Sequence, residues 1–100
     1  MAPNGTGDRT GSDETGPAEV VTVYWRRGCL HSALLRRRLR RAGLEVVERN
    51  IWDDPDAAAF VRRHAGGDET VPTVDVAGTV LVNPGARQVL ALARERGLAG

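Results

Sequence analysis

Residues 21–32 read VTVYWRRGCLHS, and this stretch, which holds the only cysteine of the chain, decides the fold. Its β-branched and aromatic start is typical of a buried strand, and a helical pattern opens at Ala33. Cys29 is therefore predicted to lie where a strand passes into the first turn of a helix. Unpaired backbone N–H groups and the positive end of the helix dipole favour an anion there. Because a thiolate in that setting has a lowered pKa, a sulfur nucleophile is the leading hypothesis.

Composition divides the chain into a polar start and one small domain. Residues 1–18 have almost no large apolar side chain and are predicted to form a disordered tail. Residues 19–100 are about as short as a single core can be without disulfides or metals. The lone cysteine excludes an internal disulfide and favours a reducing compartment. Because the first residues are too polar for a signal peptide and no apolar run reaches membrane-spanning length, we expect a cytoplasmic protein without a membrane partner.

The hydrophobic periods predict an α/β domain in the order strand–helix–strand–helix–strand–strand–helix. The strand–helix–strand unit implies a parallel pair, and the tight turn at Ala77 and Gly78 implies an antiparallel hairpin. A four-stranded mixed sheet with helices on both faces satisfies both. The predicted helices are residues 29–42 and 53–65, and the predicted first, third and fourth strands are residues 20–25, 71–76 and 79–82. Leu44, Val46 and Val47 supply the second strand, with turn-forming residues after Ile51. A last helix, capped by Asn83 and Pro84, ends near Gly97.

Three local motifs resemble the glutaredoxins, which have the thioredoxin fold. Residues 24–29 are similar to that family's strand end and cysteine loop, and Cys29-Leu30-His31-Ser32 is similar to its monothiol Cys-x-x-Ser form. Residues 70–74, TVPTV, closely match the family's Thr-Val-Pro segment. The resemblance implies a three-layer thioredoxin-like fold in which Pro72 is cis and faces the cysteine. Asn83 and Pro84 look most like the mycoredoxins, the glutaredoxin-like proteins of bacteria that use mycothiol.

The motif around Cys29 predicts thiol–disulfide exchange. Ser32 lies one helical turn beyond Cys29, so its hydroxyl can donate a hydrogen bond to the sulfur, and the positive charges of Arg26 and Arg27 favour the thiolate. Serine cannot form a disulfide with Cys29, so an external thiol must complete each cycle. Cys29 and Ser32 are therefore the predicted catalytic residues. The resemblance implies a set of substrate-binding residues that comprises Tyr24, Arg26, Arg27, Thr70, Val71, Pro72 and Asn83.

The co-substrate expected from the resemblance is a low-molecular-weight thiol, mycothiol or glutathione, with no bound cofactor. Many glutaredoxins have lysine where Arg26 stands, and the Gly-Gly-x-Asp-Asp segment that often grips glutathione is replaced by residues 82–85, VNPG. This difference is compatible with mycothiol. The partners expected are that thiol and its mixed disulfides with proteins. The alternative is a non-enzymatic role, either bridging an iron–sulfur cluster through Cys29 of two chains or acting as a redox-silent adaptor. Cluster-binding members have Gly-Phe at the two positions after the cysteine, and Leu30 would crowd a cluster.

Histidine and tryptophan add few further candidates. His31 either tunes the thiolate or faces solvent, and solvent is the better interpretation. His64 ends a helix, where a cation suits the dipole. One cysteine and two separated histidines do not make a zinc site, so no metal is expected. Trp25 and Trp52 are interpreted as core residues, with Trp25 also placed to line a groove beside the cysteine loop.

Arginine occupies every position of residues 36–41 except Leu39, and such a run is one feature of proteins that bind nucleic acid. Ser32, Leu35, Leu39 and Ala42 form an apolar stripe at helical spacing, and this leaves most of the arginines on a solvated face. No nucleic-acid module accompanies them, and aromatic residues for stacking are scarce. We therefore do not expect a nucleic-acid partner, and binding of the phosphate backbone is the alternative interpretation of this face. We expect the protein to be a monomer.

Overall fold

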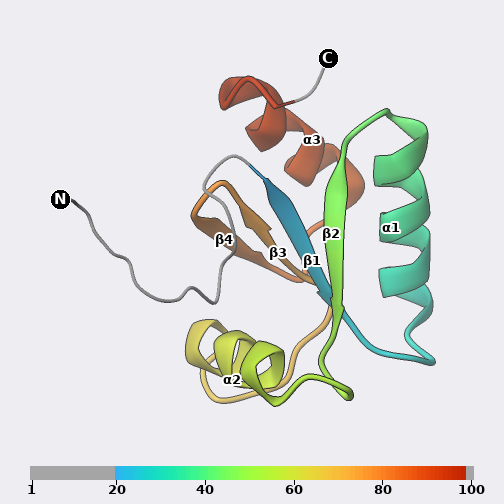
Figure 1. Ribbon diagram of the computed structural model, residues 1–100. Coiled ribbons are helices and arrows are strands. Elements are labelled where there is room, and N and C mark those ends of the chain that lie inside the picture. The colour runs from blue at the N-terminus through green and yellow to red at the C-terminus, as the bar shows by residue number, and fades with distance from the viewer. Residues whose placement is uncertain (1–19, 99–100) are drawn as a thin grey trace, which may run out of the picture.

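The computed structural model describes residues 20–98, which form one four-stranded sheet and three helices (Figure 1). The order and types of all seven elements agree with the prediction, and the predicted tail, residues 1–18, lies outside the described residues. The elements are β1 (Val21–Trp25), α1 (Leu30–Arg41), β2 (Val46–Asn50), α2 (Pro55–His64), β3 (Thr73–Val76), β4 (Thr79–Val82) and α3 (Ala86–Glu95).

The strand order of the sheet is β2-β1-β3-β4. β1 pairs in parallel with β2, in a register that places Val21 opposite Val46, because α1 carries the chain back to the starting edge. β3 is antiparallel to both β1 and β4. The predicted mixed sheet, with a parallel pair and a hairpin, is therefore confirmed. β1 is a central strand, so its carboxyl end, where the cysteine loop begins, lies between neighbours on both sides.

Two hydrophobic clusters, one on each face of the sheet, give the domain three layers. On one face α1 and α3 pack against β1 and β3 through a cluster that includes Val23, Leu39 and Val89. On the other face α2 packs through a cluster that includes Tyr24 and Phe60. Because successive side chains of a strand point to opposite faces, Val23 and Tyr24 belong to different clusters. Both faces of β1 are consequently buried.

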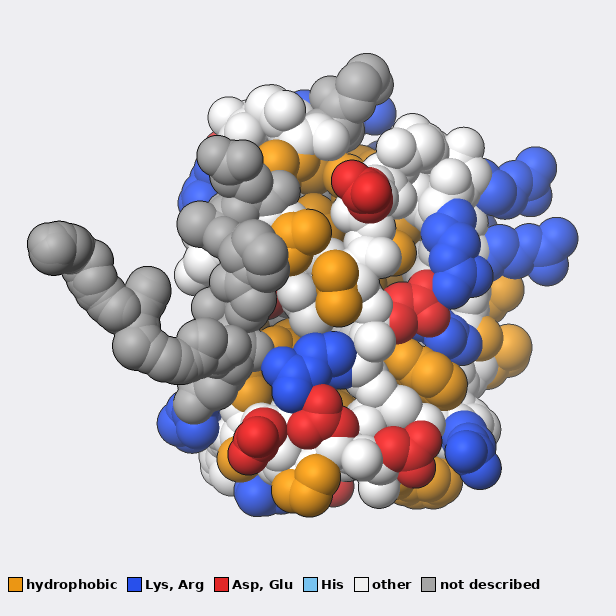
Figure 2. Space-filling view, in the orientation of Figure 1, with side chains coloured by type: hydrophobic (Ala, Val, Ile, Leu, Met, Phe, Trp, Pro, Cys, Tyr) orange, Lys and Arg blue, Asp and Glu red, His pale blue; other side chains and the backbone are white. Residues whose placement is uncertain are grey.

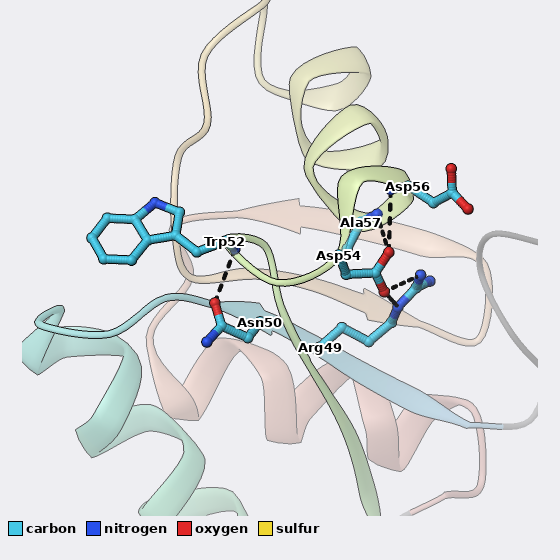
Figure 3. A network of polar contacts seen from close by, with 6 residues as sticks. All are labelled: Arg49, Asn50, Trp52, Asp54, Asp56 and Ala57. Carbon is cyan, nitrogen blue, oxygen red and sulfur yellow. Dashed lines mark hydrogen bonds and ion pairs between the residues drawn. The ribbon is translucent and has the colours of Figure 1, made fainter.

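The start of α2 is held by Asp54 (Figure 3). Its Oδ1 accepts hydrogen bonds from the backbone N–H groups of Asp56 at 3.1 Å and Ala57 at 3.2 Å, which is the capping role predicted for it. Arg49, in β2, donates two hydrogen bonds to Oδ2 at 2.9 and 2.6 Å. These bonds lower the pKa of the Asp54 carboxyl. One side chain therefore joins the end of β2 to the first turn of α2.

The start of α3 corrects the prediction that Asn83 and Pro84 cap this helix. The N-cap is Gly85, which makes no side-chain capping bond. Asn83 lies in a turn with a φ of 55°, a left-handed conformation that asparagine tolerates better than most residues. Its N–H donates to the carbonyl of Pro72 at 2.8 Å. Asn83 therefore links the end of β4 to the segment before β3 rather than capping the helix.

Three further positions differ from the prediction. Ala42 is exposed as the C-cap of α1, so the buried stripe of this helix consists of Ser32, Leu35 and Leu39 only. Val71 lies before β3, outside the strand. Trp52 is 61% exposed and is not a core residue, because it lies in the turn between β2 and α2. Within residues 20–98, no helix combines the length and the apolar character needed to cross a bilayer.

Candidate active site

Cys29 lies at the junction between β1 and α1. Gly28 turns the chain with a φ of 81°, a conformation that glycine adopts without a steric penalty. Cys29 is the N-cap of α1, just before the helix, and its backbone is extended. Its carbonyl accepts the first helical hydrogen bond from Ala33 at 3.1 Å. The half-buried sulfur is consequently held beside the unpaired N–H groups of the first turn of α1.

The segment before β3 packs against the cysteine. The Cys29 thiol donates a hydrogen bond to the carbonyl of Val71 at 3.8 Å, although 42 positions separate the two residues. The Val71–Pro72 peptide bond is cis, as the resemblance implied. The Thr73 hydroxyl donates to the carbonyl of Thr70 at 2.8 Å, and Asn83 holds the carbonyl of Pro72. The structure thus brings Thr70, Val71 and Pro72 to the cysteine loop.

The surroundings of Cys29 change its acidity. Burial of the sulfur raises the pKa of the thiol, but hydrogen bonds that the thiolate can accept from the Ser32 side chain and backbone lower it. The positive charge of Arg26 and the backbone N–H of His31 lower it further, and the net result is a lowered pKa. The hydrogen bonds and the Arg26 charge together therefore outweigh the penalty of burial. A lowered pKa increases the fraction of thiolate, which is the nucleophilic form of cysteine.

Ser32 is the polar side chain aimed at the sulfur. It is fully buried, and its Oγ has no hydrogen-bond partner among residues 20–98 while the thiol donates to Val71. A thiol that has lost its proton becomes an acceptor, and the Ser32 hydroxyl can then donate to it. Burial of an unpaired hydroxyl costs free energy in the neutral state, and that cost disappears when the thiolate forms. Ser32 therefore favours the ionised cysteine.

The two arginines of the loop have different surroundings. The Arg26 guanidinium lies over the indole ring of Trp52, 5.3 Å from the ring centroid, and its charge acts on Cys29. Arg27 is 73% exposed and its guanidinium lies 3.8 Å from the carboxylate of Asp53, to which it is turned. The predicted effect of a positive charge on the sulfur is therefore supported for Arg26 alone.

Tyr24 corrects the prediction that it binds substrate. Its side chain has no exposed surface and stacks on Phe60 in the cluster under α2, with ring centroids 4.7 Å apart. A ring enclosed in the core cannot contact a substrate, so the prediction is wrong. Trp25 instead faces the α1 side, with the Arg36 guanidinium 3.8 Å from its ring centroid.

The turn after β2 is a part of the site that the sequence analysis missed. Trp52 projects away from α2 into solvent, and the Asn50 side chain accepts a hydrogen bond from its backbone N–H at 2.9 Å (Figure 3). Together with the Arg27–Asp53 ion pair, the Arg26–Trp52 contact joins this turn to the cysteine loop. Asn50, two residues before Trp52, and Asp53 and Asp54 directly after it were the available sign of a turn.

His31 faces solvent and His64 ends a helix, as the sequence predicted. His31 is exposed in the first turn of α1. His64 ends α2, where its Nδ1 is 3.0 Å from the carbonyl of Phe60 and its ring packs on the Phe60 ring. The part of the chain that the structure describes contains no group of three or more His, Cys, Asp or Glu side chains able to hold a metal ion.

Comparison with solved structures supports the fold. A glutaredoxin from Archaeoglobus fulgidus superposes with a TM-score of 0.65 at 20% identity, over 86% of this chain and 97% of that one. A glutaredoxin from Brucella melitensis has a TM-score of 0.56 at 26% identity, over 80% and 85% of the two chains. Buckwheat glutaredoxin in complex with glutathione has a TM-score of 0.62 at 15% identity, over 80% and 81%. These likenesses confirm the thioredoxin-like architecture.

The family is established by sequence. A search of curated proteins found no match. The glutaredoxin family model, however, matches residues 21–81, which is more than half of the chain and includes both the cysteine loop and the Thr-Val-Pro segment. This chain therefore belongs to the glutaredoxin family of thiol–disulfide oxidoreductases.

Proposed function

We propose that this protein reduces mixed disulfides between proteins and a low-molecular-weight thiol by a monothiol mechanism through Cys29. The observation that carries the proposal is the setting of the sulfur, which has a lowered pKa and lies between the buried Ser32 hydroxyl and the Val71 carbonyl. Serine occupies the position from which a second cysteine would resolve the intermediate. The chain has no other cysteine, so the second thiol must come from outside.

The first step transfers the small thiol to the protein. The Cys29 thiolate attacks the small-thiol sulfur of the mixed disulfide, and a new S–S bond forms as the old one breaks. The substrate's cysteine sulfur leaves as a thiolate and takes a proton from solvent. The leaving sulfur departs in line with the attacking sulfur. Once the new S–S bond has formed, Cys29 is neutral and no longer needs stabilisation by the Arg26 charge and the Ser32 hydroxyl.

The second step restores the enzyme. The thiolate of a second small-thiol molecule attacks the small-thiol sulfur bound to Cys29, and Cys29 leaves as a thiolate. The product is the symmetrical disulfide of the small thiol, and the second molecule supplies the electron pair that reduced the substrate protein. The lowered pKa of Cys29 makes it a good leaving group here, just as it makes Cys29 ionised in the first step.

Thr70, Val71, Pro72, Arg26 and Asn83 are the proposed substrate contacts. The Val71 carbonyl already faces the sulfur, and its N–H has no partner among residues 20–98, so an extended substrate can pair with this backbone as an added strand. Arg26 offers a cation and N–H donors for a polar group of the thiol, which in glutathione is a carboxylate. Residues 82–85, which replace the segment that often grips glutathione, favour mycothiol as the natural thiol. The cytoplasm is the proposed location, because the reaction needs a supply of reduced thiol.

Single-turnover reduction tests the proposal. A protein mixed disulfide with either mycothiol or glutathione is mixed with the reduced enzyme, and release of the substrate thiol is followed. We expect Cys29→Ser to abolish release. We expect Ser32→Ala to slow it about tenfold or more, because a hydrogen bond to a charged group is worth roughly 1.5–3 kcal/mol. Transfer is expected to be faster from the mycothiol disulfide.

A matched control removes a hydroxyl far from the sulfur. Thr79→Val alters β4 at the opposite end of the sheet from the cysteine loop and is expected to keep the wild-type rate. Wild-type turnover by Cys29→Ser would contradict the mechanism. A brown preparation that absorbs visible light and loses its colour in Cys29→Ser would instead support iron–sulfur bridging. Leu30, 72% exposed beside the sulfur, speaks against that alternative.

A further inference from the structure

One exposed face of α1 carries an ordered stripe of side chains that begins beside Cys29. The spacing of three and four residues places the members on one side of the helix, opposite the buried Ser32, Leu35 and Leu39. All of the members are exposed. This α1 stripe consists of Leu30, Ala33 and Leu34 at the cysteine end, followed by Arg37, Arg38 and Arg41.

The cysteine end of the α1 stripe is apolar and hollowed. Leu30 is 72% and Leu34 46% exposed. Cys29 and Leu30 line a shallow hollow of about 280 Å³ together with Gly28 and Ala33. A second hollow, of about 180 Å³, lies on the other side of Leu34, between α1 and the start of α3. A single exposed leucine is ordinary, but adjoining ones beside two hollows form a surface suited to a partner's apolar side chain.

The far end of the α1 stripe is positive and uncompensated. Arg36 and Arg40, the neighbouring arginines of the helix, both bind the Glu48 carboxylate. Arg37, Arg38 and Arg41 have no carboxylate within ion-pair distance among residues 20–98. Figure 2 shows arginine side chains projecting from the upper part of the α1 edge, with hydrophobic side chains below them. The dipole of α1 accounts for cations in its last turn but not for their alignment with exposed leucines.

We propose that the α1 stripe docks the protein half of the mixed-disulfide substrate, and that the favoured partner is an acidic protein with an apolar side chain next to its oxidised cysteine. The proposal rests on the proposed function. The apolar side chain seats beside Leu30 and Leu34, and the partner's carboxylates face the arginines up to about 16 Å further along the helix. Charge complementarity raises the rate of productive encounter. A nucleic acid fits less well, since the end nearest the cysteine is aliphatic and has no aromatic ring for stacking.

Two disulfide peptides test the proposal. Each has a leucine beside its cysteine and carries the small thiol that the wild type accepts faster, and one has an Asp-rich tail where the other has a Lys-rich tail. At low salt we expect the wild type to reduce the Asp-rich peptide about tenfold faster or more, with the difference falling as salt is added. Arg37→Glu with Arg41→Glu is expected to reverse this preference. Leu34→Ser is expected to slow both peptides.

The matched control is Arg87→Glu with Arg94→Glu, which makes the same change of net charge on α3 and also reverses a cation in a last helical turn. It should change the peptide preference by less than about threefold.

A small mixed disulfide without a peptide measures the chemistry of Cys29 alone, and its rate should be the same in both double variants. Failure of the wild type on this small substrate would count against the proposed function. Normal reduction of it with equal rates for the two peptides, or equal responses of the two double variants, would overturn the docking proposal alone. Stripe-dependent binding of single-stranded or duplex DNA, with no peptide preference, would overturn it in favour of nucleic acid.

Discussion

At the scale of single residues, the chemistry of this protein depends on how Cys29 is surrounded. Burial of the sulfur opposes ionisation, and the Ser32 hydroxyl, two backbone N–H groups and the Arg26 charge favour it. All of these contributions act on one atom, and together they lower its pKa. In the neutral state the thiol donates to the Val71 carbonyl and the Ser32 hydroxyl has no partner. When the thiol loses its proton, the bond to Val71 is lost and the Ser32 hydroxyl can donate to the thiolate instead. The site is consequently built for a sulfur that gains and loses charge in each cycle.

We predict that the pKa of Cys29 lies below that of a free cysteine, about 8.5, and that Ser32→Ala raises it. Ser32→Ala removes the hydroxyl donor and leaves the thiolate less well stabilised. Arg27→Gln should have no effect, because that guanidinium is turned towards Asp53. The measurement is ultraviolet thiolate absorbance against pH, with Cys29→Ser as the blank. A wild-type midpoint at or above the free value would refute the argument for an activated nucleophile.

The same shift has a consequence for stability. A group whose pKa is lower in the folded than in the unfolded chain adds stability above its unfolded pKa and loses it as the pH falls through its folded pKa. The stability of the wild type relative to Cys29→Ser is therefore expected to increase as the pH rises from the pKa of Cys29 in the folded chain to its pKa in the unfolded chain. Chemical unfolding at several pH values measures it. A difference that does not depend on pH would contradict the lowered pKa.

At the scale of elements, the connection between β2 and α2 depends on Asp54, which caps the helix and binds Arg49. We predict that Asp54→Ala lowers the free energy of unfolding by about 1–2 kcal/mol, the usual range for a lost cap. Asp54→Asn should cost less, because its side chain still offers an oxygen to the N–H groups. Asp68→Ala, an exposed aspartate without an ion pair among the described residues, is the control and should change little.

The pH dependence separates the two roles of Asp54. Its pKa is lowered in the folded chain by the hydrogen bonds from Arg49, so its charge stabilises the fold above the ordinary carboxyl pKa. That contribution is lost as the pH falls through the lowered value. The difference in stability between wild type and Asp54→Asn should therefore shrink in acid. Urea unfolding curves at neutral and acidic pH measure the difference, and an increase in acid would contradict the role of the ion pair.

At the scale of the whole molecule, the sheet separates two hydrophobic clusters that must form together, because β1 contributes to both. We predict that Leu39→Ala, on the buried face of α1, costs about 2–5 kcal/mol and that Phe60→Ala, on the buried face of α2, costs about 3–5 kcal/mol. Both variants should still unfold in one transition, with coincident circular dichroism and tryptophan fluorescence curves. Leu34→Ala, at a half-exposed position, is the control and should cost less than about 1 kcal/mol. Separate transitions would show that the two layers fold independently.

The sequence by itself determined the order of the elements, the position of Cys29 at a strand–helix junction, and the capping role of Asp54. These features depend on local periodicity, on turn residues and on side chains that bond to their own neighbours. The Thr-Val-Pro match also predicted the cis bond before Pro72, which the structure contains. Each of these properties depends on residues close together in the chain or on a short motif.

Only the tertiary structure decided which side chains meet at the site. Tyr24 looked like a substrate contact, yet α2 covers its face of the sheet and buries it completely. Trp52 looked like a core residue, yet its turn lies beside the cysteine loop and leaves the indole exposed. Alternation along β1 could not distinguish an open face from a covered one, because helices pack on both. Contacts between segments far apart in the chain, such as Cys29 with Val71, depend on how whole elements pack. The hydrophobic periodicity of each element does not specify that packing.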